Sequence, residues 1–419
     1  MKIAATLLLF LWAAVAKISY DGYRVYRIDS PDFAATEAAL ASIRHVLLEC
    51  VNNHRTIEIA IAPGSVDTFE ALGLDAALTC EDLGADLAVE GELRPRLTSR
   101  SATDGGLPDE EYFTSYHALE DHMAFLDDLQ KAFPNNSETF VAGQSFEGRD
   151  IKGLHLWGCG GPGSKPAIIW HGTVHAREWI VATTVEYMAY HLIKAHHGGD
   201  ELITKTLDDY DFYIMPIVNP DGFVYTTTED RMWRKNRQPR HFTQCIGTDL
   251  NRNWPHQWNV FEGASTKPCS ETYRGVSPGD TTEMAVLTNH TMALAKSQGI
   301  KLYIDWHSFS QMILLPYAYS CFAAAANRDK QMSFAKGVSE AIRDVSGLEF
   351  VYGPACDTIY QSSGSSMDWV YDIAGAEVSW SVELRPKNFS GGGFALSPRD
   401  IMNSGEENWA GMRKLFSMF

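Results

Sequence analysis

The segment Ala167-Ile168-Ile169-Trp170-His171-Gly172-Thr173-Val174-His175-Ala176-Arg177-Glu178-Trp179 joins a short apolar run to a cluster of polar residues, and helical periodicity follows it. The apolar run predicts a buried strand, and open α/β sheets carry their sites at the carboxyl ends of such strands. His175 and Glu178 have the H-x-x-E spacing, which can place an imidazole and a carboxylate on one metal ion. A strand-end histidine beside a helix-capping glutamate would look the same, so a third ligand must decide.

Two more predicted strands end in residues of matching chemistry. His307 follows the apolar run 302–306, and it completes the His₂Glu set of catalytic zinc hydrolases if the two strand ends meet. Glu383 follows residues 378–382, whose pattern predicts another buried strand. It is either the partner of Arg385 in an ion pair or the general base that takes a proton from a metal-activated water.

A basic, amide-rich region lies between the ligand candidates. It comprises residues 231–237, Arg-Met-Trp-Arg-Lys-Asn-Arg, and residues 249–254, Asp-Leu-Asn-Arg-Asn-Trp. In a chain of net charge −18, this local positive charge suggests recognition of an anion, because arginine holds a carboxylate through two parallel hydrogen bonds. The net negative charge itself argues against nucleic acid as a partner.

The chain of 419 residues is long enough for two domains. Residues 1–16 carry a lysine, an apolar run and an A-x-A site, which predict a secretory signal peptide and a mature chain beginning near Lys17. Residues 93–108 are first basic and then small and flexible, which predicts a linker whose arginines are candidate sites of proteolysis. No later apolar run has the length and purity of a membrane span.

The region before the linker reads as a small α/β unit. We predict a strand at 23–28, a helix at 35–50, a second strand at 57–61, and then a shorter helix and strand. Cys50 and Cys80 are candidates for a disulfide within this unit, since a secreted protein retains such bonds. Three glycosylation sequons begin at Asn135, Asn289 and Asn388 and should lie on the surface if they are used.

Residues 109–419 alternate helices and strands, which predicts an α/β domain with a mixed, mostly parallel sheet flanked by helices. The strands are expected at 151–157, 167–170, 212–218, 302–306, 312–316 and 377–382. The helices are expected at 115–133, 179–195, 282–297, 331–345 and 400–416.

From about Tyr116 to the C-terminus the chain resembles the secreted zinc carboxypeptidases, in the A/B digestive branch that is made as procarboxypeptidases. The resemblance rests on linked motifs in family order: His175-Ala176-Arg177-Glu178-Trp179, Asn219-Pro220-Asp221-Gly222-Phe223, Trp233-Arg234-Lys235, Asn251-Arg252-Asn253-Trp254, Cys269-Ser270-Glu271-Thr272-Tyr273, His307-Ser308, Ile359-Tyr360-Gln361 and Glu383-Leu384-Arg385. It implies a zinc carboxypeptidase-like domain preceded by a ferredoxin-like prodomain at residues 17–92.

The resemblance also implies roles for individual residues. One Zn²⁺ per chain would bind His175, Glu178 and His307, with Glu383 as general base and Arg234 stabilising the oxyanion. The substrate-binding residues would be Arg177, Asn251, Arg252, Ser308, Tyr360 and Met367. Asn251 and Arg252 would clamp the substrate's terminal carboxylate, and Tyr360 would close over the bound peptide.

Specificity follows from the same resemblance. The pocket-floor position seven residues after the mobile tyrosine is Met367, where an aspartate accompanies basic substrates in this branch. With Ala318, Ser362 and Ser365 at neighbouring positions, an uncharged pocket favours an apolar or aromatic C-terminal side chain. The implied disulfides are Cys245–Cys269 and Cys321–Cys356, which leaves Cys159 over.

The chain departs from the family pattern at three places. Phe309 replaces the tyrosine common after His307-Ser308, the loop 386–393 is longer and richer in glycine, and residues 20–90 lack one strand expected of the prodomain. We therefore predict a secreted, monomeric zymogen that removes single C-terminal residues from peptides and proteins. Its prodomain would inhibit it until an endoprotease cuts the linker, and neither nucleic acid nor a membrane is expected as a partner.

Two other functions remain open at this point. A catalytically silent homologue would keep the zinc and bind peptides without cleaving them, although Glu383, Arg234 and Tyr360 are all present. A serine hydrolase is the third possibility, but residues 143–148 miss the G-x-S-x-G spacing by one residue.

Overall fold

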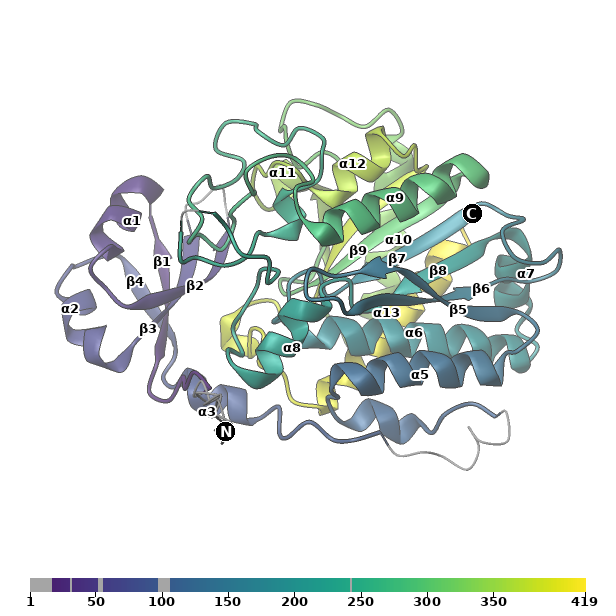
Figure 1. The fold of residues 1–419 in the computed structure, drawn as a ribbon, viewed down its shortest axis with the longest axis horizontal. Coiled ribbons are helices and arrows are strands. Elements are labelled where there is room, and N and C mark those ends of the chain that lie inside the picture. The colour runs from purple at the N-terminus through teal and green to yellow at the C-terminus, as the bar shows by residue number, and fades with distance from the viewer. Residues whose placement is uncertain (1–16, 31, 52–55, 97–105, 242) are drawn as a thin grey trace, which may run out of the picture.

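The computed structural model describes residues 17–30, 32–51, 56–96, 106–241 and 243–419. The predicted signal peptide, residues 1–16, and residues 97–105 of the predicted linker lie outside the described residues. Within these limits the chain forms a small N-terminal unit beside a larger unit, and each has its own sheet (Figure 1).

The larger unit is built on an eight-stranded mixed sheet in the order β11-β10-β12-β9-β7-β8-β6-β5. The central pairs β12–β9, β9–β7 and β7–β8 are parallel. The strands are β5 (Ser137–Gln144), β6 (Asp150–Leu156), β7 (Ala167–Gly172), β8 (Asp211–Met215), β9 (Ile300–Ser308), β10 (Met312–Leu315), β11 (Val351–Pro354) and β12 (Val378–Leu384). The predicted mixed sheet flanked by helices is confirmed.

Helices cover both faces of this sheet (Figure 1). Alternate residues of β7 enter different apolar cores, Ile168 and Trp170 on one face and Ala167 and Ile169 on the other, because successive strand side chains point to opposite faces. The first core includes α5 (Leu119–Ala132), α6 (Trp179–His197), α7 (Glu201–Asp209), α10 (Arg328–Ser346) and α13 (Arg399–Phe416), and the second includes α9 (Thr282–Ser297) and α12 (Ser366–Asp372).

The N-terminal unit has the β-α-β-β-α-β order of ferredoxin-like folds. Its antiparallel sheet runs β2-β3-β1-β4, with β1 (Arg24–Asp29), α1 (Phe33–Leu40), β2 (His45–Val51), β3 (Thr56–Ile61), α2 (Val66–Glu70) and β4 (Ala76–Cys80), and α3 (Leu83–Ala88) follows. The predicted helix 35–50 is wrong beyond residue 40. Its second half is β2, the strand that seemed to be missing.

The suggested pairing of Cys50 with Cys80 is also wrong. β2 and β4 form the two edges of the four-stranded sheet, and strands lie about 4.8 Å apart, so two intervening strands hold the cysteines too far apart for a disulfide. Cys80 is a buried free thiol whose Sγ donates to Asp86 Oδ2 at 2.9 Å.

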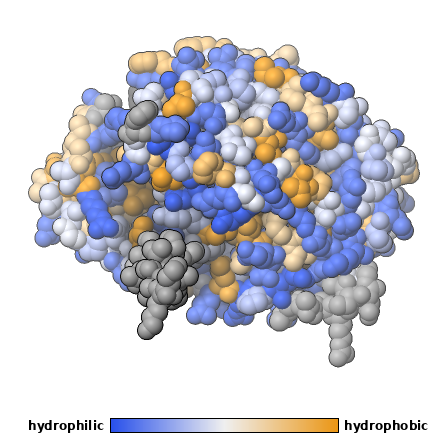
Figure 2. Space-filling view, in the orientation of Figure 1, coloured by the Kyte–Doolittle hydropathy of each residue, from blue (hydrophilic) through white to orange (hydrophobic). Residues whose placement is uncertain are grey.

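The surface of the molecule is mixed in character. On the face shown in Figure 2, hydrophilic residues predominate and hydrophobic ones are scattered among them. Across the described part of the chain, no helix is both long and apolar enough to cross a bilayer.

Candidate active site

Three strand ends bring the predicted ligands and the predicted base together. β9 and β12 are parallel neighbours, and their register pairs His307 directly with Glu383. β7 lies on the other side of β9, and the chain turns after it through Thr173, whose φ is 54°. His175 lies on this turn and Glu178 immediately precedes α6, so that both reach the same edge of the sheet.

The ligand atoms of His175, Glu178 and His307 all lie within 4.8 Å of one another, and all three residues are buried. Nδ1 of His175 is 2.8 Å from Glu178 Oε1 and 3.1 Å from Nδ1 of His307. Nδ1 of His307 is in turn 3.3 Å from Glu178 Oε2. Two imidazole nitrogens and a carboxylate converging in this way match the donor set of a catalytic zinc site.

Glu178 stands at the N-cap position of α6 but makes no capping hydrogen bond there. Its carboxylate instead turns towards the two histidines and accepts a hydrogen bond from the backbone N–H of Ser308 at 3.1 Å. The geometry therefore does not support a simple helix-capping role for this residue.

Electrostatics tie the three side chains together. Burial alone would raise the pKa of Glu178, but the charges and hydrogen bonds of His175 and His307 hold this pKa well below its ordinary value. Burial likewise opposes charge on His307, yet Asp305 and Glu178 hold the pKa of its imidazole well above the ordinary value. The negative charge of Glu178 and the positive charge of the histidine side chains thus stabilise one another. A bound metal cation would take the place of the protons that the histidines carry.

Asp249 contacts both His175 and Arg234, and it was not predicted as a site residue. Its Oδ1 is 3.1 Å from Nε2 of His175, and its Oδ2 accepts from Nε and Nη2 of Arg234 at 3.2 and 3.0 Å. Although burial raises the pKa of Asp249, the positive charges of Arg234 and His175 hold it well below the ordinary value. Its place two residues before Asn251 was the only sequence signal for it.

A cavity opens beside the cluster and contains most of the predicted site residues. It is lined by His175, Glu178, Arg234, Asn251, Arg252, His307, Ser308, Leu314, Ala318, Ala355, Ile359, Tyr360, Ser362, Ser365, Met367, Ser381 and Glu383. Arg252 Nη2 donates to the Tyr360 hydroxyl at 3.0 Å. Among the described residues the buried Ser308 hydroxyl has no hydrogen-bond partner, which leaves it available to a ligand.

Part of the cavity has apolar walls. Leu314, Ala318, Ala355 and Met367 form a small buried cluster there, and Ile359 packs against it. Ile359, Leu314 and Ala355 were not predicted as pocket residues, because their positions carry no polar signal in the sequence.

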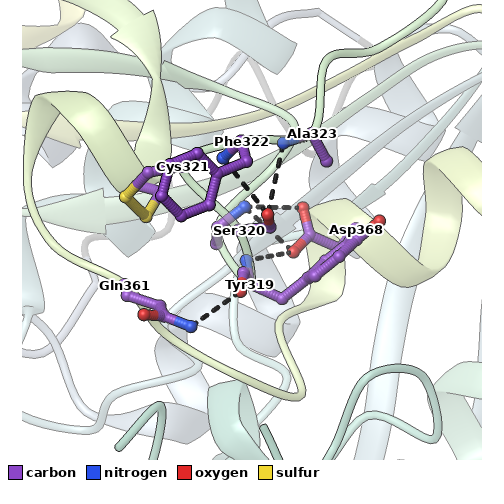
Figure 3. Close-up of a disulfide and its surroundings, with 9 residues drawn as sticks. Tyr319, Ser320, Cys321, Phe322, Ala323, Gln361 and Asp368 are labelled. Atoms are coloured by element: carbon purple, nitrogen blue, oxygen red, sulfur yellow. Dashed lines mark hydrogen bonds between the residues drawn. A yellow bond between two sulfur atoms is a disulfide. The ribbon is translucent and has the colours of Figure 1, made fainter. Parts of the chain in front are cut away.

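The loop that carries Ala318 is held from two sides (Figure 3). The Asp368 carboxylate accepts from the backbone N–H groups of Ala318 and Tyr319 at 3.0 to 3.1 Å. The Cys321–Cys356 disulfide ties the same loop to α11 (Ala355–Thr358), and Gln361 donates to Tyr319 O at 2.9 Å. Burial raises the pKa of Asp368 to about 7.

The second disulfide joins Cys245 and Cys269, so both pairs are those that the family resemblance implies. Cys159 is an exposed free thiol.

Arg177 is the one predicted substrate-binding residue that does not line the cavity. Its guanidinium is buried against the N-terminal unit, where Nη2 donates to Leu48 O at 2.6 Å and Nη1 lies 3.4 Å from Leu47 O. These two carbonyl groups belong to β2, so the guanidinium of Arg177 contacts an edge strand of the N-terminal unit.

A buried ion pair provides a second contact between the units. Arg231 Nε donates to Glu90 Oε2 at 2.7 Å, Nη2 donates to Glu90 Oε1, and the Arg231 guanidinium stacks 3.8 Å over the Trp179 ring. Glu90 is only 3% exposed, so the pair is shielded from solvent. Such a pair is costly to break, because either partner alone would be a buried, uncompensated charge.

The departures from the family pattern lie at the same interface. Phe309 packs against Phe389 and Phe394, with ring centroids 5.7 and 4.9 Å away. All three belong to one apolar cluster with residues of the N-terminal unit, among them Tyr20, Tyr23 and Leu48. The long glycine-rich loop therefore forms part of the surface on which the N-terminal unit rests.

Comparisons with known proteins agree with this geometry. A family model described as "Zinc carboxypeptidase" matches residues 122–411. The chain is 43% identical over 404 residues to a metallocarboxypeptidase A-like protein of Trichophyton verrucosum, covering 95% of this chain and 94% of that protein. It is 40% identical over 408 residues to metallocarboxypeptidase A of Arthroderma otae, covering 95% and 93%. The crystal structure of thrombin activatable fibrinolysis inhibitor superposes with a TM-score of 0.82 at 26% identity, covering 95% of this chain and 98% of that one.

Proposed function

Because the chain belongs to the zinc carboxypeptidase family and is therefore a metallocarboxypeptidase, a hydrolase, we propose that it releases one C-terminal residue, preferably apolar or aromatic, from peptides. The observation that carries this proposal is the single cavity in which the His175, Glu178 and His307 cluster, Glu383 and Arg252 all converge. We further propose that one zinc ion binds His175, Glu178 and His307. When bound, zinc supplies a Lewis acid that lowers the pKa of water to about 7.

The surrounding side chains can perform the remaining chemistry. We propose that Glu383, which is paired in register with His307, takes a proton from the attacking water and later delivers it to the leaving amine. Arg234, held by Asp249, lines the cavity, where we propose that its guanidinium stabilises the oxyanion as the carbonyl is attacked.

Substrate orientation is proposed to come from Arg252 and Asn251, which line the same cavity. Arg252 and the Asn251 amide bind the free terminal carboxylate, which fixes the scissile bond one residue away and restricts the enzyme to single-residue release. The carboxylate would take the place of the Tyr360 hydroxyl on Arg252. Tyr360 is proposed to move over the bound peptide when this exchange takes place.

The proposal can be tested with the full-length chain cleaved in the linker. We expect it to release Phe or Leu from blocked dipeptides, to lose this activity in a zinc chelator and to regain it with added Zn²⁺. Zinc binding without turnover would instead indicate a silent peptide-binding homologue. Turnover that resists the chelator would indicate a hydrolase of another kind.

The apolar pocket predicts that one substitution changes the substrate preference. Met367 is 1% exposed and lies among apolar side chains, so a C-terminal Lys or Arg finds no opposite charge there. Met367→Asp should lower kcat/KM for Phe and raise the Arg-to-Phe ratio of kcat/KM by about 10- to 100-fold, since a buried charge pair contributes about 1.5 kcal/mol or more. Met367→Leu is the volume-matched control and should keep the preference for Phe. An unchanged ratio in Met367→Asp would contradict the assignment of Met367 to the pocket.

We propose that the N-terminal unit, residues 17–92, is an inhibitory prodomain. Its strand β2 occupies Arg177, and its Glu90 holds Arg231 next to the site. Cleavage is proposed within residues 97–105, because the backbone on the N-terminal side is tied down: Arg94 N donates to Tyr116 O at 3.0 Å and Arg96 N to Asp121 Oδ1 at 3.2 Å.

Removing the buried ion pair between Glu90 and Arg231 should give the uncleaved chain more carboxypeptidase activity. Glu90→Ala leaves Arg231 unpaired, and breaking a buried pair costs about 3–5 kcal/mol, so the uncleaved variant should show at least about tenfold more activity than the uncleaved parent. The control is Glu37→Ala, which removes the exposed Lys267–Glu37 pair at 2.8 Å across the same interface and should change little. Equal activities of the uncleaved Glu90→Ala and parent chains would argue against this contact as part of the inhibition.

The remaining parts of the proposal concern location and processing. We propose that residues 1–16 direct the chain to secretion and that the mature protein acts outside the cell as a monomer. Asn135 and Asn289 are exposed and Asn388 is half-buried, so the first two are the more accessible sequons for glycosylation.

A further inference from the structure

We propose that Asp305, held by Ser366, positions His307 to present Nδ1 to the metal and is therefore needed for tight zinc binding. This inference rests on the proposed function, because it concerns a ligand of the proposed zinc. The predicted site residues include neither Asp305 nor Ser366.

The two ring nitrogens of His307 face different partners. Nδ1 points to the cluster, 3.1 Å from His175 Nδ1 and 3.3 Å from Glu178 Oε2. Nε2 points away from the cluster and lies 3.1 Å from Asp305 Oδ2. An ionised carboxylate only accepts hydrogen bonds, so Asp305 favours the tautomer with the proton on Nε2 and the lone pair on Nδ1. Carboxylates in this position orient metal-binding histidines and make them more basic.

The sheet places Asp305 where this contact is possible. Asp305 and His307 are two residues apart on β9, so both side chains project from the same face of the strand. Asp305 is completely buried between two neighbouring strands, and its register partner on β7 is His171. A carboxylate buried to this degree is costly unless a partner uses its charge. The contacts with His307 and Ser366 supply such partners.

Ser366, the first residue of α12, fixes Asp305 and also reaches the substrate clamp. Its hydroxyl donates to Asp305 Oδ2 at 2.5 Å, and its backbone N–H donates to Asn251 Oδ1 at 2.9 Å. The second contact fixes which end of the Asn251 amide is oxygen. Asn251 Nδ2 lies 3.3 Å from His307 Nε2, so the Asn251 amide and the Asp305 carboxylate both approach this ring nitrogen.

A purely structural role for Asp305 is the alternative, and the same sheet offers a matched example of that role. Asp211 on β8 is also completely buried and lies 3.3 Å from a histidine, His155 Nε2. Neither Asp211 nor His155 lines the cavity. Ser363 is likewise a completely buried serine near Ser366, but its hydroxyl donates to Trp258 O at 3.0 Å and does not reach a ligand.

The test is the zinc dissociation constant of the metal-free full-length chain, measured by competition with a chromophoric chelator. Asp305→Ala should raise this constant by about 10- to 100-fold, the effect typical of losing a partner behind a ligand. Asp305→Asn should raise it less, because the amide oxygen can still accept from Nε2. Ser366→Ala should raise it by a few-fold. The visible absorption bands of the Co²⁺-substituted chain should shift in Asp305→Ala, since the ligand field changes when His307 is no longer held.

Asp211→Ala and Ser363→Ala are the controls, and both should bind zinc as the parent does even where they lower the melting temperature. The proposal is overturned if Asp305→Ala binds zinc within twofold of the parent, or if Asp211→Ala weakens binding as much. If Asp305→Ala does not fold, the zinc affinities of Asp305→Asn and Ser366→Ala provide the test. The proposal is overturned if both of these variants bind zinc as tightly as the parent. Failure of the proposed function is a separate result, because it would appear as absence of C-terminal residue release by the cleaved parent chain.

Discussion

Glu383→Gln should lower kcat by about 10²- to 10⁴-fold while leaving zinc binding intact, because an amide cannot accept the proton that the attacking water loses. The side chain keeps its shape, and Glu383 lies in register with His307 at the ends of two parallel strands, so the cavity should be preserved. Steady-state kinetics on a blocked dipeptide ending in Phe, with zinc content measured in parallel, gives the result.

The control for this experiment is Glu377→Gln. Glu377 immediately precedes β12, and its carboxylate pairs with Lys301 at 3.0 Å on the opposite end of the strand from Glu383. This variant should retain parental kcat. A Glu383→Gln enzyme with parental kcat and a full complement of zinc would show that another group is the base.

Arg252→Gln should lower kcat/KM for peptides with a free C-terminus by about 10²- to 10³-fold. The reason is that Arg252 is buried beside the cavity and would form a charge-assisted pair with the terminal carboxylate, and truncating such a pair costs about 2–5 kcal/mol. The measurement compares a peptide acid with the corresponding peptide amide. The parent should strongly prefer the acid, and Arg252→Gln should lose most of this preference.

Arg274→Gln provides the matched comparison for Arg252. Arg274 stacks on Trp258 at 4.2 Å and does not line the cavity, so its loss should leave the preference for the acid unchanged. If Arg252→Gln lowered the rates of acid and amide equally, the residue would have a structural role and another group would bind the carboxylate.

Three of the predicted site residues were recognisable because each comes shortly after a segment that reads as a buried strand in the sequence. His175, His307 and Glu383 carry this local signal, and the topology of parallel strands then brings their ends to one edge. Asp305 and Ser366, which we propose position His307, carry no such signal. Asp305 lies within an apolar strand, and its importance depends on the orientation of the His307 ring and on Ser366, which lies 61 residues further along the chain.

The N-terminal unit shows why periodicity alone can fail. Residues 43–48 of the sequence are Ile-Arg-His-Val-Leu-Leu, and their apolar positions extend the spacing of the preceding helix. The structure ends α1 at Leu40 and begins β2 at His45, because β3 offers an edge to which these residues can pair. Strand formation here depends on a partner that lies further along the sequence, and tertiary pairing overrides the local pattern.

The chain order of the contacts has a kinetic consequence. Leu47, Leu48 and Glu90, which hold Arg177 and Arg231, all precede the residues where a protease would cut. Severing the linker therefore removes none of these bonds, and the proposal of an inhibitory prodomain then predicts that the detached segment acts as a dissociable inhibitor. The appearance of activity should lag behind cleavage by a first-order delay that excess protease cannot shorten, and dilution should increase the active fraction.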